Sequence, residues 1–213
     1  MRKTIVVSLD VTGTIVSREY VDNFWLEVIP REYARVHGVS LEEAKKRVFE
    51  EYDEVGEERI EWYIPEYWVK KYKLNKSVKE LAQEALRETH VFEDAYESLH
   101  LISNNYKLIF STNLPDSLVK PLLRKIGVEK YEIFSSVTHY HMIRKTRDFY
   151  RRVAEDLNVK PREIIHIGDD LKYDYIEPSS IGVKAILICR NTGRDVPCVR
   201  NLIEFWELIS KLE

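Results

Sequence analysis

The stretch IVVSLDVTGT, residues 5–14, decides the fold and points to a site. Its first half is an apolar run, interrupted only by Ser8, with the length and composition that favour a buried β-strand. Asp10 follows this run at once, and Gly13 with Thr14 is typical of a turn. The pattern therefore predicts a carboxylate at the carboxyl end of a buried strand, with Thr12 two residues further on.

Four further apolar runs resemble the first one, and helical patterns lie between most of them. Alternation of strands with helices is typical of a parallel sheet with helices on both faces. We therefore expect an α/β fold with a Rossmann-like parallel sheet, in which ligands bind at the carboxyl ends of the strands. The further strands are expected at residues 108–111, 133–137, 164–167 and 185–189, and the helices at residues 95–104, 115–126, 146–157 and 202–212.

Residues 17–90 break this alternation, because they contain helical patterns and no clear strand pattern. The S-x-x-E patterns at residues 40–43 and 77–80 are typical of capping boxes that open helices. Pro30 and Pro65 are expected to start or interrupt two others, because proline lacks the backbone N–H that a helix interior needs. The segment therefore predicts four or more helices inserted after the first strand.

This insert divides the chain into two expected domains. Residues 1–16 and 91–213 form an α/β core, and residues 17–90 form an all-helical cap. The cap is rich in large aromatic side chains, which fill the interior of a small helical bundle or, in a few cases, line a substrate pocket. These side chains are Phe24, Trp25, Tyr33, Phe49, Tyr52, Trp62, Tyr63, Tyr67, Trp68 and Tyr72.

Composition excludes several classes of partner. With 213 residues, of which 44% are hydrophobic, the chain can fill a substantial core. A net charge of -3 provides no basic field for nucleic acid or for an anionic membrane surface. No apolar run approaches the roughly 18 residues of a membrane span, and the first residues lead into a strand pattern without a cleavable leader. We therefore expect a cytoplasmic protein with neither partner.

The cysteine count gives little indication of redox chemistry. Cys189 and Cys198 are too few for a disulfide framework or a zinc site, and we expect two incidental thiols. Charged residues make up 32% of the chain and Gln83 is the single glutamine, which inclines the composition toward a thermophile.

Three later segments place polar side chains where the expected strands end or helices begin. Thr112 and Asn113 follow the second expected strand, Lys145 precedes a helix, and Asp169 follows the strand at residues 164–167. In this order, together with Asp10, the segments resemble the motifs of the haloacid dehalogenase superfamily: a nucleophilic Asp, a Ser or Thr, a Lys and an acidic metal-binding loop. The resemblance covers residues 1–16 and 91–190, and many members of the superfamily carry a helical insert in the position seen here.

The resemblance implies a Mg²⁺-dependent hydrolase acting on small phosphorylated compounds. Asp10 would attack phosphorus and form an aspartyl-phosphate, which is covalent catalysis by a carboxylate. Magnesium prefers oxygen ligands, and the implied ligands are Asp10, the backbone carbonyl of Thr12, and Asp169, with Asp174 orienting a metal-bound water. His166 lies within the strand before Asp169 and is expected to be structural.

The same resemblance assigns the phosphoryl-binding groups. Thr112, with help from Asn113, would donate hydrogen bonds to phosphoryl oxygens, and Lys145 would bridge the phosphoryl group and the carboxylates. The family proline after this lysine is Thr146 here. Asp170 is ambiguous, since a solvated or helix-capping position competes with a part in the site.

Thr12 departs from the superfamily pattern, in which phosphatases usually carry a second Asp that transfers protons at this place. A threonine hydroxyl is neither acid nor base near pH 7, so turnover of alkyl phosphates is expected to be slow, and aryl, acyl or anhydride phosphates are expected to suffer less. One alternative is an impaired phosphate- and metal-binding domain that acts as a sensor or partner-binding module. Minor alternatives are a dehalogenase or a phosphonatase. In a phosphonatase, Lys45 or Lys46 would supply the amine that forms an imine. The oligomeric state stays open.

Overall fold

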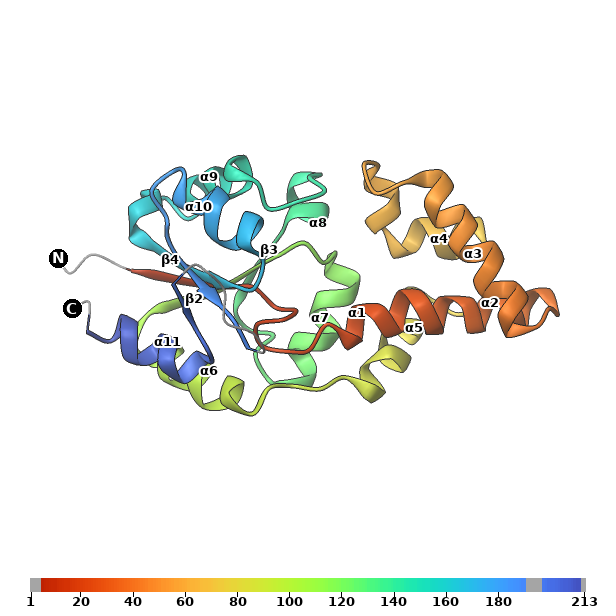
Figure 1. Ribbon diagram of the computed structural model, residues 1–213, viewed down its shortest axis with the longest axis horizontal. Coiled ribbons are helices and arrows are strands. Elements are labelled where there is room, and N and C mark those ends of the chain that lie inside the picture. The colour runs from red at the N-terminus through yellow and green to blue at the C-terminus, as the bar shows by residue number, and fades with distance from the viewer. Residues whose placement is uncertain (1–4, 191–196, 212–213) are drawn as a thin grey trace.

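The computed structural model describes residues 5–190 and 197–211 and contains a six-stranded parallel sheet in the order β3-β2-β1-β4-β5-β6. Figure 1 shows this sheet at one end of the molecule and the helical insert at the other. The expected α/β fold with a Rossmann-like parallel sheet is confirmed. The strands are β1 (Val6–Leu9), β2 (Lys107–Thr112), β3 (Glu132–Ser135), β4 (Ile164–Gly168), β5 (Lys184–Ile188) and β6 (Cys198–Val199).

Helices cover both faces of the sheet, with α6 and α11 on one side and α9 and α10 on the other (Figure 1). The central strand is buried on both faces, because Val7 and Leu9 pack in one apolar cluster while Val6 packs with Phe149 in the other. This explains the nearly continuous apolar run, since strands covered on both faces lose polar alternation. The core helices are α6 (Glu93–Asn105), α7 (Asp116–Lys125), α8 (Ser136–Tyr140), α9 (Arg147–Asp156), η4 (Pro161–Glu163), η5 (Leu171–Ile176), α10 (Glu177–Ser179) and α11 (Leu202–Ile209).

The insert is helical throughout its regular part. Pro65 opens one helix. Pro30 directly follows the π-helical turn η1 within an unbroken helical run of residues 19–37. Ser77 and Glu80 form a complete capping box, and Ser40 accepts a hydrogen bond from the backbone N–H of Glu43. The elements are α1 (Glu19–Asn23), η1 (Phe24–Val28), α2 (Ile29–His37), α3 (Leu41–Val55), η2 (Ile60–Tyr63), α4 (Pro65–Lys71), α5 (Val78–Ala85) and η3 (Leu86–Glu88).

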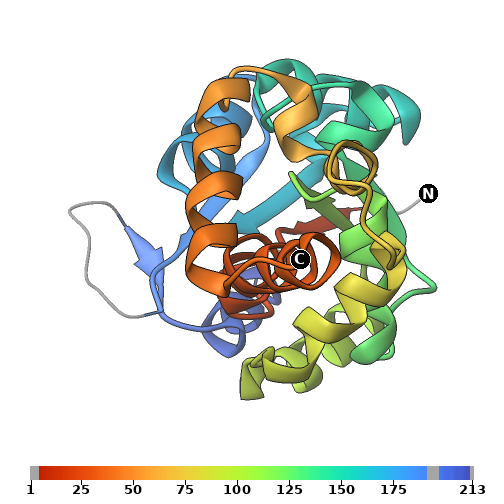
Figure 2. The same cartoon turned by 90° about the vertical axis from the view of Figure 1, so that its right-hand side faces the viewer.

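Aromatic side chains fill the interior of the insert. In Figure 2 the helices of the insert face the viewer. Trp68 is completely buried, with its ring 4.6 Å from that of Tyr52 and 5.4 Å from that of Tyr72. Such packed rings stabilise a fold by more than the apolar area that they bury accounts for. The rings of the insert thus pack on one another, and its buried apolar residues belong to the same cluster as those of the sheet. The division of the chain into two domains stays a prediction.

Three details differ from the sequence-based expectations. The strand expected at residues 133–137 ends at Ser135, because α8 begins there and the Ser135 hydroxyl accepts a hydrogen bond from the N–H of Thr138. The sheet also has a sixth strand, β6, whose two residues are too short for a periodic pattern. The helix expected to reach residue 212 ends at Ile209, and residues 212–213 lie outside the described part.

The expectation of two incidental thiols was wrong. Cys189 and Cys198 form a disulfide, with their Cα atoms 5.9 Å apart. The reason is the pairing of β5 with β6, which places Leu187 opposite Cys198 and so brings the two cysteines together at the sheet edge. Spacing along the chain could not indicate this, because it depends on the unpredicted strand.

No helix in residues 5–190 or 197–211 has the length and hydropathy that a membrane crossing requires.

Candidate functional site

The strand register brings the polar side chains of the expected motifs to one edge of the sheet. Leu9, the last residue of β1, is opposite Phe110 of β2 and Ile167 of β4. Thr112, the last residue of β2, therefore lies at nearly the same level as Asp10 and Asp169, which follow β1 and β4. They line a cavity of about 440 Å³ that is closed on its other side by residues of the insert.

Lys145 is the central cation of the cavity floor, and its side chain is almost completely buried. Its ammonium group donates to Asp10, lies 2.5 Å from Asp174 Oδ1 and donates to the Ser111 carbonyl at 3.1 Å. Burying a charge is costly unless it is paired and hydrogen-bonded, and these contacts meet that need. Burial alone would lower the pKa of Lys145, but the two carboxylates outweigh it and raise the pKa, so the group stays charged.

The two carboxyl groups beside Lys145 differ in their proton affinity. Burial raises the pKa of Asp10 to about 7, although the Lys145 ammonium opposes the shift. Burial also disfavours the charged form of Asp174, but there Lys145 and His166 together outweigh it and lower the pKa. Asp174 therefore holds its negative charge more firmly than Asp10 does.

A buried hydrogen-bonded chain holds Asp174 from behind. His166 Nε2 lies 3.0 Å from Asp174 Oδ1, and its Nδ1 lies 2.9 Å from the Ser8 hydroxyl, which donates to the Ser111 hydroxyl. The Tyr150 hydroxyl donates to Asp174 Oδ1 at 3.3 Å. Burial lowers the pKa of His166, so the imidazole is neutral near pH 7. His166 therefore has the structural place expected from the sequence.

Two glycines let the acidic loop approach the first strand. A Cβ on Gly13, which has φ of +79°, would lie 2.1 Å from Asp169 Oδ2. A Cβ on Gly168 would lie 2.3 Å from Asp174 Cγ. Contacts this short do not occur, so any side chain at either position would push the carboxylates apart.

Asp10, Asp169 and Asp174 can each offer one oxygen such that the three atoms lie within 4.8 Å of one another. Their cationic partners are Lys145 and Arg18, and Arg18 donates to Asp169 Oδ2 at 2.7 and 3.0 Å. Burial raises the pKa of Asp169, and Arg18 opposes that shift. Three carboxylates thus share two cations, and the clustered oxygen donors fit a hard divalent cation.

The other expected site residues also lie at this cavity. Thr12, Thr112 and Asn113 line it. In this structure the Thr112 hydroxyl accepts a hydrogen bond from the N–H of Leu114, and the Asn113 amide oxygen accepts one from the Ser136 hydroxyl. The structure thus brings together every residue that the sequence assigned to the site.

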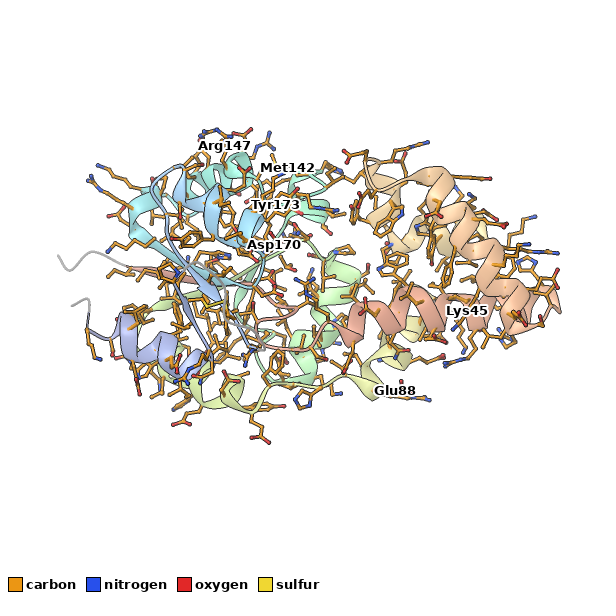
Figure 3. The ribbon with its side chains drawn as sticks, in the orientation of Figure 1. Lys45, Glu88, Met142, Arg147, Asp170 and Tyr173 are labelled. Carbon is orange, nitrogen blue, oxygen red and sulfur yellow. A yellow bond between two sulfur atoms is a disulfide. The ribbon has the colours of Figure 1, made fainter. Side chains whose placement is uncertain are left out.

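Asp170 caps a helix while it lies at the rim of the cavity. Its Oδ1 accepts hydrogen bonds from the backbone N–H groups of Lys172 and Tyr173, at 2.9 and 2.8 Å. Figure 3 shows Asp170 and Tyr173 on the side of the core that faces the insert. The helix-capping alternative for Asp170 is therefore the one that the structure bears out.

Sequence reasoning missed three residues of the site. Arg18 and Tyr150 contact the acidic residues, and Arg144 has its guanidinium carbon 4.7 Å from the ring centre of Tyr63 in the insert. Arg144 also donates to Glu57 at 3.5 Å. An isolated arginine or tyrosine in a charged sequence carries no pattern. For these three residues, the one indication in the sequence was that Arg144 directly precedes Lys145, the lysine of the motif.

The aromatic residues of the insert divide between the two expected places. Most pack in the interior of the insert, whereas Trp25, Trp62 and Tyr63 line the cavity. Lys45 lies far from Asp170 and Tyr173 in Figure 3, and its ammonium is 2.5 Å from Glu27 Oε1. A salt bridge within the insert therefore holds Lys45, away from the cavity floor.

Comparison with known proteins assigns the family of the chain. Residues 6–177 match the family model of haloacid dehalogenase-like hydrolases. The chain is 23% identical over 166 residues to the GMP/IMP nucleotidase YrfG of Escherichia coli, which covers 76% of this chain and 73% of that protein.

Solved structures show the same fold. A HAD phosphatase from Thermococcus onnurineus superposes with a TM-score of 0.79 at 23% identity, covering 97% of this chain and 98% of that one. The putative HAD-hydrolase YfnB from Bacillus subtilis, solved bound to magnesium, has a TM-score of 0.64 at 17% identity and covers 98% of this chain and all of that one. With most of its length matched by the family model, the chain belongs to the haloacid dehalogenase-like hydrolases.

Proposed function

We propose that this hydrolase is a Mg²⁺-dependent phosphatase of small phosphorylated compounds, with Asp10 as its nucleophile. The observation that carries the proposal is the buried ammonium of Lys145, held between Asp10 and Asp174 at the floor of a cavity. A pocket that pairs a carboxylate with fixed positive charge suits phosphoryl transfer, because charge on the equatorial oxygens must be neutralised.

In the first step a carboxylate oxygen of Asp10 forms a bond to phosphorus as the bond from phosphorus to the leaving oxygen breaks. Lys145 neutralises charge on the phosphoryl oxygens, and Thr112 and Asn113 supply hydrogen bonds to them. These two side chains must exchange their present partners, Leu114 and Ser136, for the substrate. In the second step water attacks the aspartyl-phosphate, which releases inorganic phosphate and restores Asp10.

Asp10, Asp169, Asp174 and the carbonyl of Thr12 are the groups that would hold Mg²⁺, with Asp174 acting through a water. Bound there, the ion would supply positive charge to the phosphoryl oxygens and relieve the repulsion among the carboxylates. The clustering of three carboxylate oxygens within 4.8 Å supports this assignment. Arg18 must then leave Asp169 at least in part, since both cations address the same carboxylate.

Thr12 makes the chain a specialised or slow phosphatase. A general acid at its position would protonate the leaving oxygen, a contribution of about 10²- to 10⁴-fold. The threonine keeps its carbonyl but offers no proton near pH 7. Leaving groups that are stable as anions therefore depend less on the missing acid than alkoxides do.

The insert, residues 17–90, acts as the cap over a core made of residues 1–16 and 91–213. The insert lines the cavity with Trp25, Trp62 and Tyr63. The guanidinium of Arg144, in the core, lies over the Tyr63 ring. Selectivity for the leaving group is accordingly assigned to the cap. A cytoplasmic location and a thermophilic source stay predictions from the composition.

A broad panel of phosphate esters, assayed with and without Mg²⁺, tests the proposal, and Asp10→Asn serves as the inactive control. The proposal predicts phosphate release that needs both the ion and Asp10. Tight phosphate binding without turnover would favour the sensor alternative, to which Thr12 lends some support. Halide release from haloacids, or phosphate release from phosphonates, would favour the two minor alternatives.

A further inference from the structure

The wall of the cavity contributed by the insert differs sharply from its floor. The floor carries Asp10, Lys145 and Asp169, whereas the facing wall carries Trp25, Leu26 and Trp62, with Tyr63 nearby. The insert also contributes two charged residues to the lining, Arg18 and Asp22. Leu26 is 43% exposed and lines the cavity together with the indole rings of Trp25 and Trp62. A bound apolar group would cover this leucine.

A second, smaller cavity lies beside the first one, within the insert. It has a volume of about 50 Å³ and is lined by Trp25, Leu26, Tyr52 and Trp62. Three of these residues also line the main cavity, so the two spaces adjoin. Ring and aliphatic atoms form its wall, and the Trp25 and Trp62 rings are tilted by 31° with centres 6.3 Å apart.

Two hydroxyl groups at this end of the cavity are turned to partners within the insert. The Tyr52 hydroxyl donates to the Trp25 carbonyl at 3.3 Å, and the Tyr63 hydroxyl donates to the Glu57 carbonyl at 3.0 Å. A ligand that needs several hydrogen bonds would lose bonds to water here without regaining them, which costs free energy. The subsite therefore disfavours sugars and favours an apolar ring.

We propose that Trp25, Leu26 and Trp62 form a leaving-group subsite for a planar apolar ring, so that the substrates are aryl phosphates. This inference rests on the proposed phosphatase function and names its substrate class. Two independent features agree on it, since the wall accepts a ring and Thr12 supplies no acid. A phenolate leaves without a proton far more readily than a sugar alkoxide, so aryl esters suit both features.

Binding of phosphonates separates ring recognition from leaving-group chemistry, because their carbon–phosphorus bond resists this hydrolysis. Phenylphosphonate and methylphosphonate carry the same charged head and differ in the ring. Calorimetric titration of each into the full-length protein with Mg²⁺ is expected to show about tenfold tighter binding of phenylphosphonate. In Trp62→Ala that ratio is expected to fall by about three- to tenfold, as the loss of one ring contact implies.

Two further variants guard against trivial explanations. Trp62→Leu keeps apolar bulk without a ring, and it should retain part of the preference for phenylphosphonate. Tyr96→Ala removes an aromatic ring that is 55% exposed on α6, outside the residues lining either cavity, and it should leave the ratio unchanged. Thermal melting of each variant verifies that the insert is folded.

The outcomes separate the subsite from the function on which it rests. Equal binding of the two phosphonates, or an unchanged ratio in a folded Trp62→Ala, would overturn the subsite and leave the phosphatase proposal standing. Binding of neither phosphonate, together with no turnover of any ester, would overturn both. Tighter binding of GMP than of phenyl phosphate to Asp10→Asn would overturn the choice of a simple aryl group.

Discussion

The floor and the wall of the same cavity differ in the kind of side chain that they present. The floor belongs to the core and consists of charges, with Lys145 and Asp174 almost fully buried and tied to each other. The wall belongs to the insert and presents two indole rings and a leucine, although the charged Arg18 and Asp22 of the insert also line the cavity. Under the proposed function, the floor would determine which bond is broken, while the wall would determine which molecule is held. Substitutions in each should therefore fail in different ways.

The largest expected effect is the loss of the nucleophile. Asp10→Asn should reduce turnover by about 10⁴-fold or more on every ester, because the amide cannot form the aspartyl-phosphate. Phosphate release measured across an ester panel tests this. The control Asp53→Asn changes an exposed carboxylate of the insert and should leave turnover unaltered. Comparable activity of Asp10→Asn and wild type would remove Asp10 from the reaction.

The next effect is a gain of function in Thr12→Asp. If the missing acid limits the protein, this variant should raise kcat on alkyl phosphates by about 10²- to 10⁴-fold and change aryl phosphates little. Thr12→Val, which removes only the hydroxyl, should resemble the wild type on both. An equal loss on alkyl and aryl esters in Thr12→Asp would show that the threonine has a positive part in the site.

The third effect concerns stability, and it tests the claim that the floor is an ion network. Lys145→Met should lower the free energy of unfolding by about 3–5 kcal/mol, because it leaves Asp10 and Asp174 buried without their shared cation. Urea unfolding at neutral pH in the presence of a chelator measures the change. Lys184→Met, at an exposed position of β5, is the matched control and should cost little.

The smallest effect lies in the insert and shows how little charge matters there. The Arg35 guanidinium, followed by Lys76, holds the pKa of the Glu32 carboxyl below its usual value of 4.5. Because the pKa is lowered on folding, this contact stabilises the protein above about pH 4.5, and the contribution disappears as the pH falls through the folded-state pKa.

Glu32→Gln should accordingly destabilise the protein by about 1–2 kcal/mol at pH 7, and the difference from wild type should shrink below pH 4.5. Urea unfolding over a pH series measures this. Glu43→Gln alters a surface pair with Arg47 and should have almost no effect. A loss in Glu32→Gln that persisted at low pH would point to packing rather than charge.

The core and the insert also differed in how far the sequence predicted them. The five expected strands and four expected helices of the core were located to within a few residues, because buried strands and amphipathic helices leave strong local patterns. The short helices α8, η5 and α10 were not predicted. Short β6 left no such pattern, and the Cys189–Cys198 pair was missed with it. The helical nature of the insert was predicted, yet no pattern separated Trp62, which lines the cavity, from Trp68, which is buried inside.

Within the site, the sequence by itself determined the floor. Asp10 and Asp169 each follow a strand and Thr112 ends one, and neighbouring parallel strands end at a common edge, so their meeting follows from topology. Only the tertiary structure decided which side chains come from elsewhere to meet them. Arg18, Tyr150 and the aromatic wall depend on how the insert and the helices pack, which is a long-range property that no local pattern encodes.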